Sequence, residues 1–460
     1  MSLLIKNGRV ITADSDYIAD IFIDGEVVKA IGEDLPMKAG KEIDATGKFV
    51  FPGGVDPHVH LDMPFMGTFS SDNYQTGTKA ALFGGTTMVI DFVLQKQGNS
   101  LQSALEEWRT RSDDNCVGDY SFHMAVTDFN ENTKREIRGM IEDEGITSFK
   151  TFMAYKGALM IDDRQMVGLM EEVNKHGGLI NVHATNGDMI DYLVAKHRNE
   201  GKLSPLYHYL SQPEVTEAEA SERFADMAYY TGCPGYIVHL TCEGALNAVR
   251  NATRRNQKIF VETCIQYLIL DASLYEKDFE AAKWVMSPPL RQKKDQDTLW
   301  AGINQGLVQV VATDHCPFKW EQKLMGKDDF SKIPNGHPAI ENRMELLYSE
   351  GVHTGKITLN KYVEVACTNP AKIFGMFPRK GTIAVGSDAD IVIFDPTKKH
   401  KLSAMTHHMN VDYSGYEGWS VTGKVETVLL RGKVAIENNH CHVDKGYGKF
   451  VRRSKVSQMI

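Results

Sequence analysis

Apolar positions alternate between two spacings through the middle of the chain. Eight short runs have the length and the β-branched or aromatic content of buried strands: Val55–Leu61, Thr86–Val93, Tyr120–Val126, Ser148–Ala154, Leu179–Ala184, Tyr236–Thr241, Ile259–Cys264 and Val308–Thr313. Between most of them, apolar residues recur at helical spacing, at Ser100–Ser112, Lys134–Glu144, Asp163–His176, Thr216–Thr231 and Glu243–Asn256. Eight strand–helix units within about 260 residues predict an α/β protein built on a (β/α)8 TIM-like barrel.

A doubly wound open sheet is the alternative for the same alternation. That fold would be favoured by a glycine-rich nucleotide-binding turn after an early strand. The sequence contains no turn of the GxGxxG or GxxxxGK[ST] type. The barrel is therefore the preferred prediction.

Both ends of the chain consist of short strands and turns. The candidate strands are Leu3–Ile5, Asp20–Ile23, Lys29–Ile31, Phe49–Phe51, Ala389–Phe394 and Thr427–Leu430. Neither end is expected to form a stable sheet alone, so we expect both to pair into one smaller β-sandwich-like domain. The predicted division is 1–50 for its first part, 51–375 for the barrel and 376–460 for its second part plus a tail.

The last residues and two histidine clusters lie in or beside this terminal domain. The tail from Cys441 to Ile460 carries five basic residues against one acidic. We expect a solvated end there rather than an arm that crosses to another subunit. His407-His408 and His440-Cys441-His442 have spacing like that of metal ligands, but their position predicts surface histidines.

The composition is that of an ordinary globular protein, with 42% hydrophobic and 24% charged residues. Lys plus Arg number 51 against 60 Asp plus Glu, so the formal net charge is -9. Because nucleic-acid affinity depends on clustered Lys and Arg, no nucleic-acid partner is expected. No run reaches the roughly 18 apolar residues of a membrane span, and Met1–Asp14 does not resemble a signal peptide. Seven scattered cysteines without a CxxC pair favour a reducing compartment. We therefore expect a cytoplasmic protein without a membrane partner.

Candidate chemistry gathers at one end of the predicted strands. In Asp56-Pro57-His58-Val59-His60, both histidines point to the same face of an extended strand. His183, His239 and Asp314 lie at or just past the carboxyl ends of the fifth, sixth and eighth strands, where barrel enzymes build their active sites. Each residue alone would more often be structural. Together, the four histidines and the aspartate form a ligand set that suits zinc or manganese.

Lys150, within Ser148-Phe149-Lys150-Thr151-Phe152, is the unusual member of this group. A buried lysine is costly unless it is neutralised or paired, and the simpler reading is an ammonium that reaches solvent. An unmodified ammonium cannot bind a cation. Carbamylation by carbon dioxide would create a carboxylate able to bridge two ions, although the spacing alone does not show this modification.

Several motifs in order along the chain resemble the amidohydrolase superfamily, and within it the D-hydantoinase and dihydropyrimidinase family. They are the segment from Gly54 to His60, the Lys150 segment running into Tyr155, His183, His239, Thr313-Asp314-His315-Cys316, Pro334-Asn335-Gly336 and the segment from Gly381 to Asp390. The resemblance extends over nearly the full length. Two positions depart from the family pattern: Thr185 replaces a usual Glu and Ile265 a usual Pro.

The resemblance implies a site with two divalent ions, zinc or manganese, and a bridging hydroxide. One ion would be held by His58, His60, carbamylated Lys150 (N6-carboxylysine) and Asp314, and the other by the same Lys150 with His183 and His239. Asp314 would also move the proton, and Tyr155 would polarise the substrate carbonyl. Ser287 and Asn335 would grip the ring amide through main-chain groups. Candidates for an apolar side-chain pocket are Met63, Phe65, Phe152 and Leu159.

The activity implied is opening of 5-substituted hydantoins and dihydropyrimidines to N-carbamoyl amino acids, with D-selectivity. The alternatives are dihydropyrimidine hydrolysis as the main natural activity, an allantoinase-like or dihydroorotase-like hydrolase, and a non-catalytic scaffold. The chain retains all six ligand positions, which disfavours the scaffold. No cationic residue stands out near the named loops to meet an allantoin or dihydroorotate substituent. The family also implies a homotetramer, or a dimer.

Overall fold

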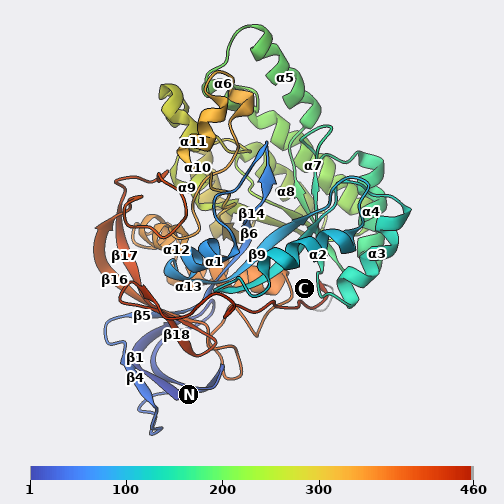
Figure 1. The fold of residues 1–460 in the computed structure, drawn as a ribbon. Helices are drawn as coiled ribbons and strands as arrows, with labels where there is room; N and C mark the ends of the chain where they lie inside the picture. Colours follow the sequence, from blue (N-terminus) through green and yellow to red (C-terminus); the bar gives the residue numbers. More distant parts are fainter. Residues whose placement is uncertain (1, 457–460) are drawn as a thin grey trace.

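The computed structural model describes residues 2–456, and its centre is a sheet of eight parallel strands (Figure 1). The strands are β6 (Gly54–Val59), β9 (Thr86–Leu94), β10 (Asp119–Ala125), β11 (Ser148–Phe152), β12 (Leu179–His183), β13 (Gly235–Ile237), β14 (Ile259–Cys264) and β15 (Val310–Ala312). They pair in the order β15-β14-β13-β12-β11-β10-β9-β6. The main-chain N–H of His60 donates to His315 O at 2.8 Å, which joins β6 to the segment after β15. The predicted barrel is thereby confirmed.

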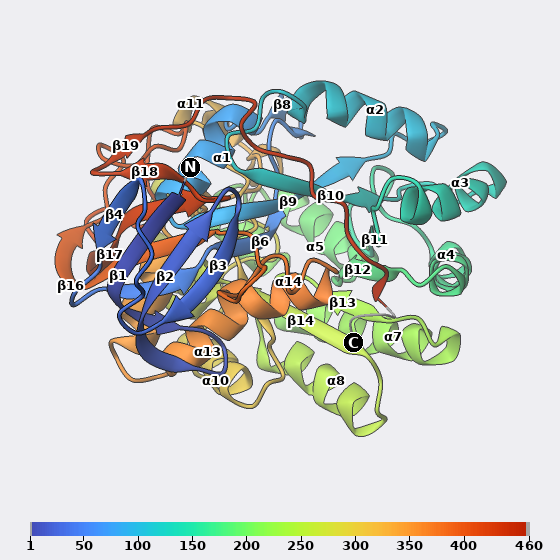
Figure 2. The same cartoon turned by 90° about the horizontal axis from the view of Figure 1, so that it is seen from below.

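Helices cover the outside of this barrel, as Figure 2 shows from below. The α-helices are α1 (Tyr74–Phe83), α2 (Leu101–Ser112), α3 (Glu131–Glu142), α4 (Asp163–Lys175), α5 (Gly187–Asn199), α6 (Leu206–Leu210), α7 (Glu214–Thr231), α8 (Glu243–Arg254), α9 (Ile265–Ile269), α10 (Lys293–Asn304), α11 (Trp320–Lys323), α12 (Arg343–Leu347), α13 (Leu359–Val363) and α14 (Asn369–Ile373). Because both faces of the sheet are covered, strands such as β10 are buried at every residue. This explains their continuous apolar runs.

Shorter elements complete the barrel. They are the hairpin β7 (Pro64–Phe65) and β8 (Thr68–Phe69), the 3₁₀ turns η1 (Ala272–Glu276), η2 (Asp278–Trp284), η3 (Leu324–Gly326) and η4 (Phe330–Lys332), and the π-helical turns η5 (Tyr348–Val352) and η6 (Glu364–Thr368). Among the described residues, none of the helices combines the length and apolar composition needed to cross a membrane.

Both ends of the chain contribute to a second, nine-stranded sheet. Its strands are β1 (Ser2–Ile11), β2 (Asp16–Asp24), β3 (Val27–Gly32), β4 (Lys41–Asp44), β5 (Phe49–Pro52), β16 (Ile391–Lys401), β17 (Ser420–Leu430), β18 (Lys433–Glu437) and β19 (His440–Cys441). The join between the two ends is antiparallel pairing of β5 with β16. Side chains such as Ile5, Val50 and Ile391 form an apolar cluster separate from the barrel core. The domain boundaries at residues 50 and 375 stay a prediction.

The described part of the C-terminal tail, residues 441–456, corrects one expectation, because part of it is buried against the barrel and it is not a fully solvated end; residues 457–460 lie outside the described residues. The segment runs beneath the barrel beside β10 and β11 (Figure 2), where the Tyr120 N–H donates to Lys449 O at 3.1 Å. Val451 and Val456 are buried. The Arg453 guanidinium donates to Ser121 Oγ at 3.1 Å and to Ser148 Oγ at 2.8 Å. The basic composition suggested solvation, but the apolar residues and one arginine of the tail pack against the barrel.

The histidine clusters of the terminal region divide. His440 and His442 are exposed, as expected for surface histidines. His407 and His408 are half-buried instead. The His408 ring stacks on Phe83, and its Nδ1 lies 2.8 Å from a Glu341 oxygen. The His407-His408 pair therefore packs against the barrel, and the prediction that these two are surface histidines was wrong.

Candidate active site

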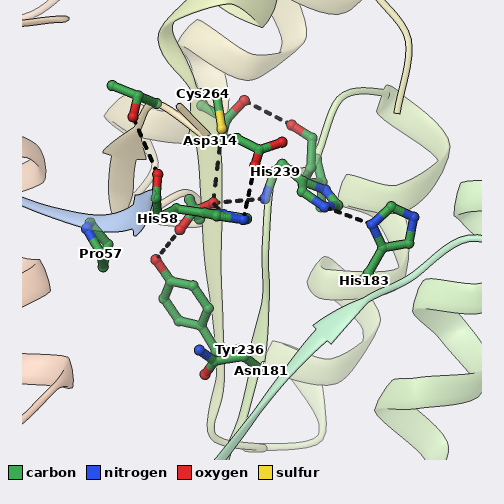
Figure 3. Close-up of polar contacts among 12 residues, drawn as sticks. Pro57, His58, Asn181, His183, Tyr236, His239, Cys264 and Asp314 are labelled. Atoms are coloured by element: carbon green, nitrogen blue, oxygen red, sulfur yellow. Dashed lines mark hydrogen bonds and ion pairs between the residues drawn. The ribbon is translucent and has the colours of Figure 1, made fainter. Parts of the chain in front are cut away.

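The six predicted metal ligands come from five strands and meet at one end of the barrel. Lys150 lies within β11 and His183 ends β12. His58 lies within β6 and His60 follows it, while His239 and Asp314 come two residues after the ends of β13 and β15. Because parallel strands end at the same rim of a barrel, residues far apart in the sequence face one pocket, which all six line. Figure 3 shows four of them, His58, His183, His239 and Asp314.

One group of ligands gathers around the Asp314 carboxylate. Its Oδ1 lies 3.1 Å from His58 Nε2 and 3.0 Å from His60 Nε2. The three residues are close enough to hold a single ion. Two ligands of one tetrahedral zinc ion lie about 3.3 Å apart, since each bond is about 2.0–2.1 Å long. The observed spacing therefore fits a metal.

The charges in this first group are strongly coupled. Burial alone would lower the pKa of His58, but the Glu262 and Asp314 carboxylates raise it to about 9. Burial alone would raise the pKa of Asp314, but the charge of His58 and hydrogen bonds from both histidines hold it well below its usual value. Asp314 is therefore an ionised carboxylate near neutral pH.

The second group consists of His183 and His239. His183 Nδ1 lies 2.9 Å from His239 Nε2, so both nitrogens face the same point. Burial, together with the nearby Lys150 charge, lowers the pKa of His183 to about 3, and burial holds the pKa of His239 well below its usual value. Within residues 2–456, the buried Nε2 of His183 has no hydrogen-bond partner. Neutral imidazoles that face one point are suited to bind a cation.

Lys150 lies between these two groups. Its side chain is buried, and its positive charge adds to burial in lowering the pKa of His60 on one side and of His183 on the other. Nζ lies 5.0 Å from the ring centroid of Phe92 and 5.3 Å from that of Phe152. Burial lowers the pKa of Lys150 to about 8. A substantial fraction is therefore neutral amine near pH 7–8, the form that can react with carbon dioxide.

The predicted substrate-binding residues surround the same pocket. Tyr155, Ser287 and Asn335 line it, as do the four apolar candidates Met63, Phe65, Phe152 and Leu159. Burial raises the pKa of Tyr155 to about 12, although hydrogen bonds with Ser287 and Asn335 oppose the shift. The Tyr155 hydroxyl is therefore a proton donor throughout the neutral range. Thr185 and Ile265, the two departures from the family pattern, are buried outside the lining of this pocket.

Three site residues have left-handed backbone conformations. The φ angles are 63° at Tyr155, 40° at His239 and 50° at Asp314. Such angles cost energy in residues other than glycine and persist where the surrounding fold enforces them. The fold thus aims these side chains into the pocket at some cost to local stability.

Glu262 is a site residue that the sequence reasoning missed. Its Oε1 lies 2.6 Å from His58 Nδ1 and accepts the main-chain N–H of His239 at 3.0 Å. Its other oxygen accepts the Tyr236 hydroxyl at 2.9 Å. One carboxylate therefore orients a ligand in each group. The available signal was an acidic side chain within a largely apolar predicted strand.

Comparison with known proteins agrees with this geometry. The model of the amidohydrolase family matches residues 49–435, and the chain belongs to this family. It is 45% identical to a D-hydantoinase of Geobacillus stearothermophilus, over 100% of this chain and 98% of the relative. A dihydropyrimidinase of Rattus norvegicus is 41% identical, with coverage of 100% and 90%. The crystal structure of a dihydropyrimidinase from Brevibacillus agri superposes with a TM-score of 0.98 at 48% identity, with 99% of each chain covered. Membership of this family implies that the site binds divalent metal.

Proposed function

We propose that this protein opens 5-substituted hydantoins and dihydropyrimidines to N-carbamoyl amino acids. Its family and its full-length relatives make it a hydrolase of cyclic amides. The observation that carries the proposal is the convergence of six ligating side chains, a tyrosine hydroxyl and two loop segments on one pocket. Such a pocket combines a site for cations with donors aimed at a carbonyl oxygen.

The proposed metal centre uses all six ligands. His58, His60 and Asp314 would hold one ion, His183 and His239 the other, and a carbamylated Lys150 would contribute to both. When bound, two such ions, with zinc favoured over manganese, lower the pKa of a shared water so that hydroxide is available near neutral pH. The short distance between His183 Nδ1 and His239 Nε2 supports the second position, and the short distances from Asp314 Oδ1 to His58 and His60 support the first.

The protein's own residues perform the remaining steps. The Tyr155 hydroxyl, which stays protonated, donates to the ring carbonyl oxygen as negative charge develops on it. The Ser287 and Asn335 main chains hold the adjacent ring amide. Asp314, ionised at neutral pH, accepts the proton of the attacking water and returns it to the ring nitrogen when the C–N bond breaks.

The pocket wall supports tolerance of different ring substituents. Met63, Phe65, Phe152 and Leu159 offer apolar contacts, and an apolar wall discriminates by only about 1–3 kcal/mol for each methylene. We therefore propose hydrolysis of both aryl and alkyl hydantoins, with the D-selectivity taken from the similarity to D-hydantoinases. Dihydropyrimidine hydrolysis as the main activity is the second candidate, because relatives with both names match the full chain.

The test compares turnover of dihydrouracil with that of the two enantiomers of a 5-arylhydantoin, with the ring-opened product identified by mass spectrometry. Faster turnover of the D-hydantoin supports the proposal, while faster turnover of dihydrouracil favours the second candidate. If the metal-loaded protein opens neither ring, both fail. We further propose a cytoplasmic homotetramer, or a dimer, which sedimentation measurements would decide.

A further inference from the structure

Lys323 is a buried lysine that the proposed mechanism does not use. It ends α11, and its side chain has an exposed fraction of 0%. Its ammonium donates to three main-chain oxygens, Val285 O at 3.0 Å, Pro334 O at 2.7 Å and Gly336 O at 2.9 Å. A lysine ammonium has three N–H donors, and each has an acceptor here.

Within residues 2–456, no carboxylate forms an ion pair with Lys323, and burial lowers the pKa of its amine to about 7. A buried cation without a counter-ion is costly. A methionine would fill a similar volume without that cost, so space filling alone does not explain a lysine at this position.

The three acceptors belong to the two loop segments that face the substrate pocket. Val285 lies two residues before Ser287, and Pro334 and Gly336 flank Asn335. The Gly336 N–H also donates to Val285 O at 2.9 Å, so the segments are joined directly as well. Ser287 and Asn335 both line the pocket together with Tyr155. Lys323 therefore lies between the Ser287 and Asn335 segments and is hydrogen-bonded to the main chain of both.

The Gly336 segment has little freedom to move in the other direction. A Cβ atom on Gly336 would lie 2.1 Å from Cys316 O, so this backbone packs directly against the segment that carries Asp314. The loop is thus held between the Cys316 main chain on one side and the Lys323 ammonium. Loss of the ammonium would release only the second contact.

We propose that Lys323 is a positioning residue for substrate binding. Its ammonium fixes the spacing between the Ser287 and Asn335 main chains, which sets how well they grip the ring amide. The inference rests on the proposed function of this pocket. It assigns Lys323 no contact with substrate or metal, so its removal should weaken binding of the ring more than the chemical step.

The experiment compares the metal-loaded wild-type protein with Lys323→Met, which keeps the side-chain length but removes all three donors. The matched control is Lys327→Met, which removes the same charge from an exposed position four residues later. KM and kcat are measured with a 5-substituted hydantoin and with dihydrouracil. Bound metal and the thermal midpoint of each variant are measured in parallel.

For Lys323→Met, KM should rise about tenfold or more on both substrates, while kcat falls less than about threefold. Its metal content and that of the control should equal the wild-type value. An unchanged KM, or a loss of kcat that follows the loss of metal, overturns the inference. If the wild-type protein opens the rings but Lys323→Met gives one of these results, only the inference about Lys323 fails and the proposed function stands. If the metal-loaded wild-type protein is inactive on both substrates, the proposed function itself is rejected.

A second variant covers the case in which Lys323→Met fails to fold. Lys323→Gln retains an N–H donor group on a shorter side chain, so its KM should lie between those of the wild type and Lys323→Met. If Lys323→Gln folds with a wild-type KM, or if neither variant folds, Lys323 supports the fold rather than substrate binding, and the inference is wrong.

Discussion

His58 Nδ1 lies 2.6 Å from Glu262 Oε1, and the same oxygen accepts the main-chain N–H of His239. An acceptor at Nδ1 keeps the proton on that nitrogen, so Nε2, which faces Asp314, is the nitrogen that would bind a cation in place of its own proton. Glu262 therefore determines the tautomer of one ligand and the backbone position of another. A carboxylate that touches no substrate in the proposed mechanism should still control metal affinity.

Replacing Glu262 tests this relationship. Glu262→Gln removes the charge and keeps the size, so metal affinity should fall about 10- to 100-fold. Competition with a chelator, followed by elemental analysis, measures the change. Glu276→Gln, at an exposed position, is the control and should bind metal like the wild type. Equal affinities in the two variants would remove Glu262 from the support of the centre.

Lys150→Ala tests the bridging ligand. If carbamylated Lys150 contributes to both metal positions, the variant should lose bound metal and more than about 100-fold of its ring-opening rate. A short-chain carboxylic acid such as propionate should restore part of both, because it supplies the missing carboxylate. The control is Lys156→Ala, which removes an exposed lysine that pairs with Asp188, and it should keep the metal content and turnover of the wild type. Full metal content and turnover without added acid would contradict the bridging role.

Tyr155→Phe tests the donor to the developing oxyanion. Removal of one well-aimed donor should lower kcat about 10²- to 10³-fold. Metal content should not change, because the hydroxyl is assigned to the substrate. Since burial raises the pKa of Tyr155 to about 12, the wild-type rate should show no loss from ionisation of this hydroxyl up to pH 10. Steady-state kinetics with metal analysis measures both effects.

His208 gives the stability a predictable pH dependence. Its Nε2 lies 2.8 Å from Met286 O, and burial lowers the pKa of His208 to about 4. The unfolded chain, with a histidine pKa near 6.5, takes up the proton first as the pH falls. The stabilisation is therefore complete above about pH 6.5 and is lost toward pH 4, by up to about 1.4 kcal/mol per pH unit.

This dependence is measured from the denaturation midpoints at pH 7.5 and pH 5. His208→Gln cannot take up the proton, so its midpoint should fall less between the two pH values than that of the wild type. The variant is expected to be less stable at pH 7.5, and the comparison therefore uses the difference between the midpoints. An equal pH difference in both proteins would assign the acid sensitivity to other groups.

The hydrogen bonds of Arg453 indicate that the C-terminal tail contributes to the stability of the protein. Arg453→Met leaves the hydroxyl groups of Ser121 and Ser148 without this donor, which should cost about 1–3 kcal/mol. Lys445→Met, at an exposed position of the same tail, is the control and should change stability by less than about 0.5 kcal/mol. Thermal unfolding of the two variants makes the comparison. Equal midpoints would mean that the tail adds nothing through Arg453.

The sequence predicts those parts of this protein that depend on local pattern. The barrel strands were found because each is a short, fully buried apolar run, although β13 ends at Ile237, before the predicted Thr241. His58, His60, His183, His239 and Asp314 stood out because polar side chains followed these runs. All thirteen predicted site residues line one pocket. The prediction of the other eight also required the family resemblance.

The residues that were missed have partners that no local pattern shows. Glu262 is one acidic residue in a largely apolar strand. Its role depends on a hydrogen bond with His58, which lies 204 residues earlier in the sequence. The Lys323 ammonium donates its hydrogen bonds to main-chain carbonyls, which carry no sequence signal. The prediction of a solvated tail was wrong because it rested on the basic composition of the segment. The surface beneath the barrel, against which the tail packs, forms only when the chain folds and leaves no sign in the sequence.

The pairing of β5 with β16 has a consequence during synthesis. β5 lies next to β1 near the start of the chain, but its other edge is covered only by residues from Ile391 onward. A nascent chain must therefore carry an open strand edge while the whole barrel is made, and open edges invite pairing with other chains. Release from the ribosome before β16 emerges would leave a product prone to aggregate, however well its barrel had folded.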